Sequence, residues 1–182
     1  MPFYRRASFR EAIKWVVYGL ILLLAYCLQT TKGLTIPIFG VRPLLMVGVV
    51  ICVAFFEQEV GACVFAFFAG LLMDYACNTL LGYFALFFVL TSLAISFLTH
   101  FLALPNFTTF LAVSSVSLVL LCHADFFFRF VLTEEEGLVP YYLHTFLPTW
   151  LYTGLTILLF YFLLRFVFLR LQPQNEAEMT AI

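Results

Sequence analysis

The stretch PLLMVGVVICVAFFEQEVGACVFAFFAGLLM, Pro43 to Met73, is apolar over 31 residues except for a polar patch near its middle, Glu57 to Glu59. A single helix of this length would rise about 46 Å, more than the roughly 30 Å of a bilayer core, and would bring both carboxylates near the bilayer centre. A pair of shorter helices joined by a tight turn at Glu57 to Gly61 avoids both costs. Because each half has only about 14 or 15 residues, we expect it to extend into its flank, or to be covered by protein or by a thinned bilayer.

The composition of the whole chain explains why a bilayer is its expected environment. Of 182 residues, 64% are hydrophobic and 10% charged, and the mean hydropathy of +1.07 is far above that of soluble globular domains. At roughly 20 residues per spanning helix, the length fits about five to seven spans and leaves no room for a separate catalytic domain. The net charge of -1 and the nine Lys and Arg residues exclude a basic groove for nucleic acid. We therefore predict a single all-α integral membrane domain, residues 1–182.

Polar breaks divide this domain into its predicted spans. They fall at Gln29 to Gly33, at Asn78 and Thr79, at Pro105 and Asn106, and at Glu134 to Glu136. The prediction is six transmembrane helices at about residues 13–28, 42–57, 60–74, 82–101, 107–130 and 146–169, followed by a short cytoplasmic tail at 170–182.

The first apolar run, Trp15 to Leu28, allows other interpretations. It follows a basic segment, so it could be a secretory signal, and because it ends near Cys27 it could be a lipoprotein signal. The bulky Tyr26 directly before Cys27 is wrong for lipoprotein cleavage, and we favour an uncleaved first span.

The distribution of basic residues predicts the orientation, because cytoplasmic loops carry an excess of Lys and Arg. Six spans with both chain ends inside give a cytoplasmic majority. Merging the spans at 42–57 and 60–74 would move the basic C-terminal end outside, which is a second reason to prefer the turn. The predicted inner side holds Arg5, Arg6, Arg10, Lys14, Arg165 and Arg170, and the outer side holds Lys32, Arg42 and Arg129.

Charged residues at membrane depth are candidate functional sites because they are costly unless they are paired. Asp125 and Arg129 are four residues apart near the outer end of the predicted span 107–130, where they can form an ion pair that fixes the helix end. His123 lies on another face of that helix, and helix packing accounts for it better than proton transfer does. Asp74 and Asp125 are the remaining possibility for an aspartyl protease pair, but neither lies in mid-span.

The acidic residues beside the short spans have simple structural interpretations. Glu57 and Glu59 would cap and solvate the cytoplasmic turn, with Gly61 relieving the chain reversal. Asp74 and Asn78 suit the outer end of the next span. Asp74 could alternatively anchor the outer loop or a partner, and the sequence does not choose between these roles.

A stripe of small residues, Ala62, Ala66 and Gly70, recurs every fourth residue and permits close approach of another helix in lipid. The other helix can belong to this chain, which is the simpler interpretation, or to a partner protein.

No catalytic, cofactor or metal site is predicted. The sequence lacks GxSxG, HExxH and P-loop motifs, and its three histidines are scattered. The five cysteines form no CxxC pair and fit small membrane-embedded side chains better than a metal or redox site.

The order of landmarks from Leu28 to Leu90 resembles a known family. A first span ends in Leu28 and Gln29, Pro43 opens the segment RPLLMVGVV, and a polar reversal ends at Gly61. The segment FAGLLMDYACNTLLGYFAL follows, with a GLLxD motif at Gly70 to Asp74 and then Leu81 and Gly82. This pattern is similar to that of MreD, a family of bacterial cell-shape proteins. A basic residue usually precedes the glycine of the reversal in that family, whereas this chain has Glu57 to Glu59.

The resemblance implies a six-span fold like that of the substrate-binding components of energy-coupling-factor transporters. It also implies a non-enzymatic scaffold in the bacterial cytoplasmic membrane, in the machinery that positions peptidoglycan synthesis during cell elongation. The implied partners are MreC, through its transmembrane helix, and RodA, a class B penicillin-binding protein and MreB filaments. The implied structural residues are Gln29, Pro43, Gly61, Gly70, Asp74 and Gly82.

A transport role is the alternative. A small-solute, vitamin-like ligand would then bind beneath the outer loops near Lys32, Arg42 and Asp125. Such a pocket needs several converging polar groups, and the sequence offers few.

Overall fold

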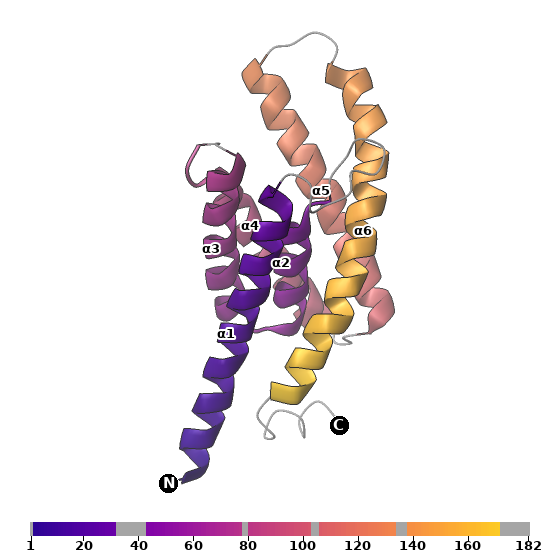
Figure 1. Ribbon diagram of the computed structural model, residues 1–182. Coiled ribbons are helices and arrows are strands. Elements are labelled where there is room, and N and C mark those ends of the chain that lie inside the picture. Colours follow the sequence, from indigo (N-terminus) through magenta and orange to yellow (C-terminus); the bar gives the residue numbers. More distant parts are fainter. Residues whose placement is uncertain (1, 32–42, 78–79, 103–105, 134–137, 172–182) are drawn as a thin grey trace.

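The computed structural model describes residues 2–31, 43–77, 80–102, 106–133 and 138–171, and among these the side chains of 11–31, 43–77, 80–99, 106–123 and 148–170. The described residues form a bundle of six α-helices and contain no strand (Figure 1). The all-helical prediction is confirmed. The helices are α1 Pro2–Thr30, α2 Leu45–Phe56, α3 Glu59–Cys77, α4 Tyr83–Leu102, α5 Phe107–Thr133 and α6 Leu138–Leu171.

The break between α2 and α3 lies where the polar patch predicted it. α2 ends at Phe56 and α3 begins at Glu59, so the stretch from Pro43 to Met73 is not a single helix. α3 extends beyond the predicted segment 60–74 and reaches 19 residues, whereas α2 has only 12 residues and would span about 18 Å.

Within the described part of the chain, three helical segments are long and apolar enough to cross a membrane: Glu11–Thr30, Glu59–Cys77 and Pro148–Arg170. Shorter apolar helical segments are found at Leu45–Phe56, Tyr83–Thr99 and Phe107–His123. These lengths and compositions are those of a membrane protein.

The short helix α2 occupies the centre of the bundle. It contacts each of the other five helices, and its residues from Leu45 to Phe55 are all buried. Since α2 carries no charged residue, every side of it can be covered by apolar neighbours. The expectation that a span too short for a bilayer would be covered by protein is met at α2.

Consecutive helices run in opposite directions, so their starts and ends alternate between the two ends of the bundle (Figure 1). α1 begins, α2 turns into α3 and α6 ends at one of them (Figure 1). At the opposite end, α5 and α6 extend beyond the other helices (Figure 1). α6 has 34 residues and would be about 51 Å long, which exceeds the thickness of a bilayer core.

Candidate functional site

The inward face of α1 carries polar residues at both ends and apolar residues between them. Lys14, Tyr18, Leu22 and Ala25 are buried and follow one another at helical spacing, and Gln29 continues the same face. Lys14 and Gln29 are 15 residues apart, or about 22 Å along the helix, so α1 brings polar groups to both ends of the shorter α2.

The first polar cluster joins α1 to the end of α2. Lys14 Nζ lies 2.8 Å from Glu57 Oε2, and the Tyr18 hydroxyl donates a hydrogen bond of 2.8 Å to Glu57 Oε1. The side chains of Lys14 and Glu57 are only 7% and 6% exposed. The prediction that Glu57 solvates the turn is therefore wrong, because its carboxylate is buried and neutralised by Lys14. Glu59, in contrast, is exposed.

Aromatic rings enclose this ion pair. The Lys14 ammonium lies 5.9 Å from the ring centroids of both Trp15 and Phe168, and the Tyr18 ring packs edge to face against Trp15 at 5.8 Å. A Cβ on Gly61 would lie 2.7 Å from Trp15 Cζ2, so glycine lets this indole lie against α3. The rings exclude water, which strengthens the attraction between the two charges and also raises the cost of leaving either one unpaired.

The second polar cluster satisfies the start of α2. The first N–H groups of a helix have no partner within the helix, and in an apolar environment they need one from outside. The Met46 N–H donates to Gln29 Oε1 at 3.0 Å, and the Leu44 N–H donates to Thr153 Oγ1 of α6 at 3.2 Å. Gln29 Nε2 also lies 3.2 Å from Met73 Sδ of α3. Buried Pro43 precedes these donors and has no N–H of its own.

Asp74 joins the end of α3 to the start of α4. Its Oδ2 accepts from the Gly82 N–H at 2.8 Å, and its Oδ1 accepts from the Phe84 N–H at 2.7 Å. The residue is 1% exposed. Gly82 has φ +99°, a conformation that side chains disfavour. Of the roles considered for Asp74, the structure supports an anchor for the connection between α3 and α4.

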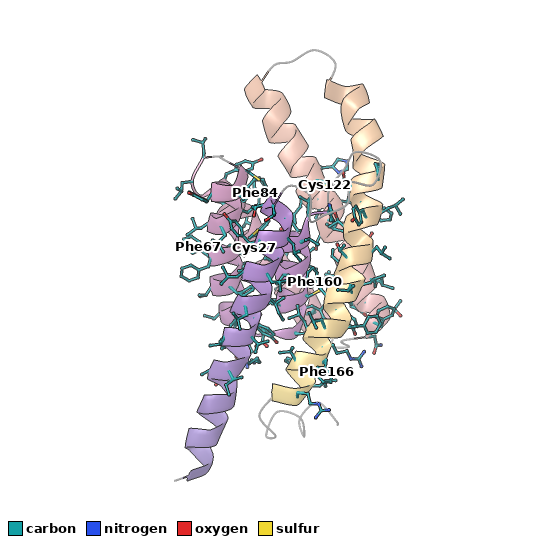
Figure 2. All side chains as sticks on the ribbon, in the orientation of Figure 1. Cys27, Phe67, Phe84, Cys122, Phe160 and Phe166 are labelled. Atoms are coloured by element: carbon teal, nitrogen blue, oxygen red, sulfur yellow. The ribbon has the colours of Figure 1, made fainter. Side chains whose placement is uncertain are left out.

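The small-residue stripe is buried inside the bundle. Ala62 and Ala66 are buried, and a Cβ on Gly70 would overlap the backbone of Ala85 on α4. These residues make contacts between helices of this chain, which leaves no surface there for a partner's helix. Figure 2 shows that Phe67, on the same helix, instead points away from the bundle.

Several predicted residues lie outside the described side chains or make ordinary contacts. The side chains of Asp125 and Arg129 are outside the described part of the chain, so their ion pair stays a prediction, and the disfavoured Asp74–Asp125 pairing is not tested. His123 is exposed, and its Nδ1 lies 2.8 Å from the Val119 carbonyl oxygen. Within the described residues, no group of three His, Cys, Asp and Glu side chains is arranged to hold a metal ion.

Sequence reasoning missed the roles of Lys14, Tyr18 and Thr153. Lys14 was counted only as a charge for orientation, although Lys14 and Tyr18 stand four residues apart on the buried face of α1. That spacing was a usable signal. Thr153 carried no such signal, because its partner, the Leu44 N–H, lies 109 residues away.

Taken together, the described polar groups act on helices of this chain. The pair Lys14–Glu57, the caps from Gln29 and Thr153, and the carboxylate of Asp74 each join different helices. No protein-family model matches the chain, and neither a curated protein nor a solved structure matches it.

Proposed function

We propose that this chain is a non-enzymatic, six-span scaffold of the bacterial cytoplasmic membrane that binds MreC and helps position peptidoglycan synthesis during cell elongation. The proposal rests on the sequence resemblance to MreD between Leu28 and Leu90. Its physical support is the way in which the residues of that resemblance are used.

The observation that carries the proposal is that the motif residues hold helices together. Gln29 caps α2, Gly61 accommodates Trp15, Gly70 accommodates Ala85, and Asp74 binds the N–H of Gly82. Each of these contacts joins segments of this chain. A motif made of such contacts specifies a shape, which is what a scaffold presents to its partners.

The six-span orientation with both ends inside has its own support. α1 begins and α6 ends at the same end of the bundle (Figure 1), as an even number of crossings requires. Reporter fusions can test it: green fluorescent protein fused to either chain end should fluoresce, and alkaline phosphatase inserted after Pro105 should be inactive. An active phosphatase there, or ends on opposite sides, would refute the six-span form.

Copurification with MreC tests the function. The two proteins are coexpressed with a tag on this chain, and the complex is isolated in mild detergent. We expect MreC to be retained in a fixed ratio. No retained MreC, together with a tightly held vitamin-like ligand in stoichiometric amount, would favour the transport alternative.

The contact face for the partner can be sought on the outer side of α3, the helix that carries the motif. Its outward residues include Val64, Phe67 and Phe68, which are 53%, 46% and 59% exposed. A photo-crosslinking residue at Phe67 should capture MreC more efficiently than the same residue at Leu159, an exposed position on α6. Equal capture at both positions would remove α3 as the preferred face. Substitutions of Ala66 or Gly70 are unsuitable for this test because both residues are buried.

A further inference from the structure

The end of the bundle where α1 begins and α6 ends gathers arginines. Arg6 and Arg10 belong to α1, and Arg165 and Arg170 belong to α6. These residues are called the basic end below. In the proposed orientation, the basic end faces the cytoplasm.

Lys14 does not add to the basic end, because its charge is neutralised by Glu57. Its ammonium is 2.8 Å from the Glu57 carboxylate and its side chain is 7% exposed. This pairing also removes the negative charge of Glu57 from the surface. The exposed carboxylates among the described side chains at this end are those of Glu11 and Glu59.

Arg165 and Arg170 are exposed and are placed by aromatic rings. Arg165 Nη1 donates to the Tyr161 hydroxyl at 3.1 Å, and its Cζ lies 5.7 Å from the Tyr161 ring centroid. Arg170 Cζ lies 5.2 Å from the Phe166 ring centroid. Neither makes an ion pair with a carboxylate among the described side chains. A guanidinium held over a ring keeps donors free for a planar, doubly hydrogen-bonded contact with a phosphate.

Arg10 and Arg6 precede Lys14 in α1 by four and eight residues. Lys14 itself faces α6, because its ammonium lies 5.9 Å from the Phe168 ring. The basic end thus combines positions from both helices.

We propose that the basic end is a binding surface for the headgroups of anionic phospholipids in the adjoining leaflet. Arginines beside a spanning helix attract such lipids, and the guanidinium fork suits their phosphate oxygens. The inference rests on the membrane location in the proposed function. It does not require binding to MreC, so each proposal can fail without the other.

Trp15 provides a built-in reporter for this surface. The chain has two tryptophans. The Trp15 ring lies 5.9 Å from the Lys14 ammonium, which is equally close to Phe168, so it reports on the region between α1 and α6. The other, Trp150, has a buried Nε1 without a hydrogen-bond partner among the described residues, and W150F should therefore be tolerated.

The experiment uses the full chain carrying W150F in phosphatidylcholine vesicles. Brominated phosphatidylglycerol, which quenches tryptophan on contact, is added in one series, and brominated phosphatidylcholine is added in a matched series. We expect phosphatidylglycerol to quench Trp15 at a several-fold lower mole fraction. R165Q/R170Q should remove most of that preference, because each arginine near the surface contributes to the attraction to an anionic leaflet.

Two control variants separate charge from structure. R165K/R170K should keep most of the preference, and K32Q, which changes a basic residue just after the other end of α1, should leave it unchanged. If R165Q/R170Q does not insert, R170Q alone and the wild-type arginines in high salt provide the decisive comparison, because high salt should weaken the preference. Equal quenching by the two lipids, or a preference that neither salt nor R170Q lowers, would overturn the proposal.

Discussion

Gly70 of α3 lies against the backbone of Ala85 of α4, so closely that a Cβ at Gly70 would overlap it and would lie 2.8 Å from the Phe84 carbonyl carbon. The contact involves main-chain atoms, which cannot move aside as a flexible side chain could. Glycine at this position therefore sets how closely α3 and α4 pack.

Replacing Gly70 with alanine should destabilise the protein despite the better helix propensity of alanine. Forcing a methyl group into a packed contact costs about 1–3 kcal/mol, and more where backbone must shift. Unfolding in detergent micelles by titration with sodium dodecyl sulfate measures the change. Gly154→Ala is the matched control, because a Cβ there meets nothing within 4 Å and should be neutral or slightly stabilising. Equal stability of the two variants would contradict the packing argument.

Removing Lys14 alone should be more harmful than removing the whole ion pair. K14M leaves the Glu57 carboxylate buried with only the Tyr18 hydroxyl as a partner, and breaking a buried pair in this way costs about 3–5 kcal/mol. K14M/E57L removes both charges and should recover much of the loss, as measured by the same unfolding titration. Glu59→Gln, at an exposed position, should have little effect. If the loss of stability in K14M/E57L equals the sum of the losses in K14M and in E57L, the two side chains are not coupled.

Asp74→Ala should loosen the start of α4. It leaves the Gly82 and Phe84 N–H groups without their carboxylate, and a buried unsatisfied group costs about 1–3 kcal/mol. Asp74→Asn keeps one carbonyl acceptor and should fall between wild type and alanine. Hydrogen exchange at Phe84, followed by mass spectrometry, should rise in the order wild type, Asn, Ala. Unchanged exchange in the alanine variant would exclude this role for Asp74.

Gln29→Leu should destabilise the start of α2 while keeping the side chain of similar size. The Met46 N–H would lose its acceptor, with an expected cost of about 1–3 kcal/mol. The neighbouring Thr30→Ala is a suitable control, because the Thr30 hydroxyl bonds only to carbonyls of α1 and is exposed. The expected readout is a lower unfolding midpoint for Gln29→Leu alone.

The division of Pro43 to Met73 into two helices could be predicted from the sequence, because it follows from the local cost of placing charge inside a bilayer. The burial of Glu57 could not, because it depends on Lys14, which is 43 residues away. Ala62, Ala66 and Gly70 were recognised as a contact stripe, but spacing alone does not identify the helix on the other side. The partner proved to be α4 at Gly70.

Two helices continue beyond the spans predicted for them, for identifiable reasons. α1 begins at Pro2, before the predicted span 13–28, because Arg, Glu, Ala and Lys favour helix outside a membrane as well as inside it. α6 begins at Leu138, before the predicted span 146–169. Pro140 lies in the first turn of α6, where its missing N–H costs nothing.

The enclosure of α2 constrains how the protein is made. The Leu44 N–H donates a hydrogen bond to Thr153, 109 residues later, and Gly48 packs against Ile157 of α6. At a translation rate of roughly 5–20 residues per second, the ribosome needs about 5–20 s to synthesise the intervening chain. During this interval α2 has been synthesised, but α6, the last helix that contacts it, has not. The native bundle can therefore form only after the final helix has emerged. A nascent chain stopped before α6 would lack the helix that completes the burial of α2.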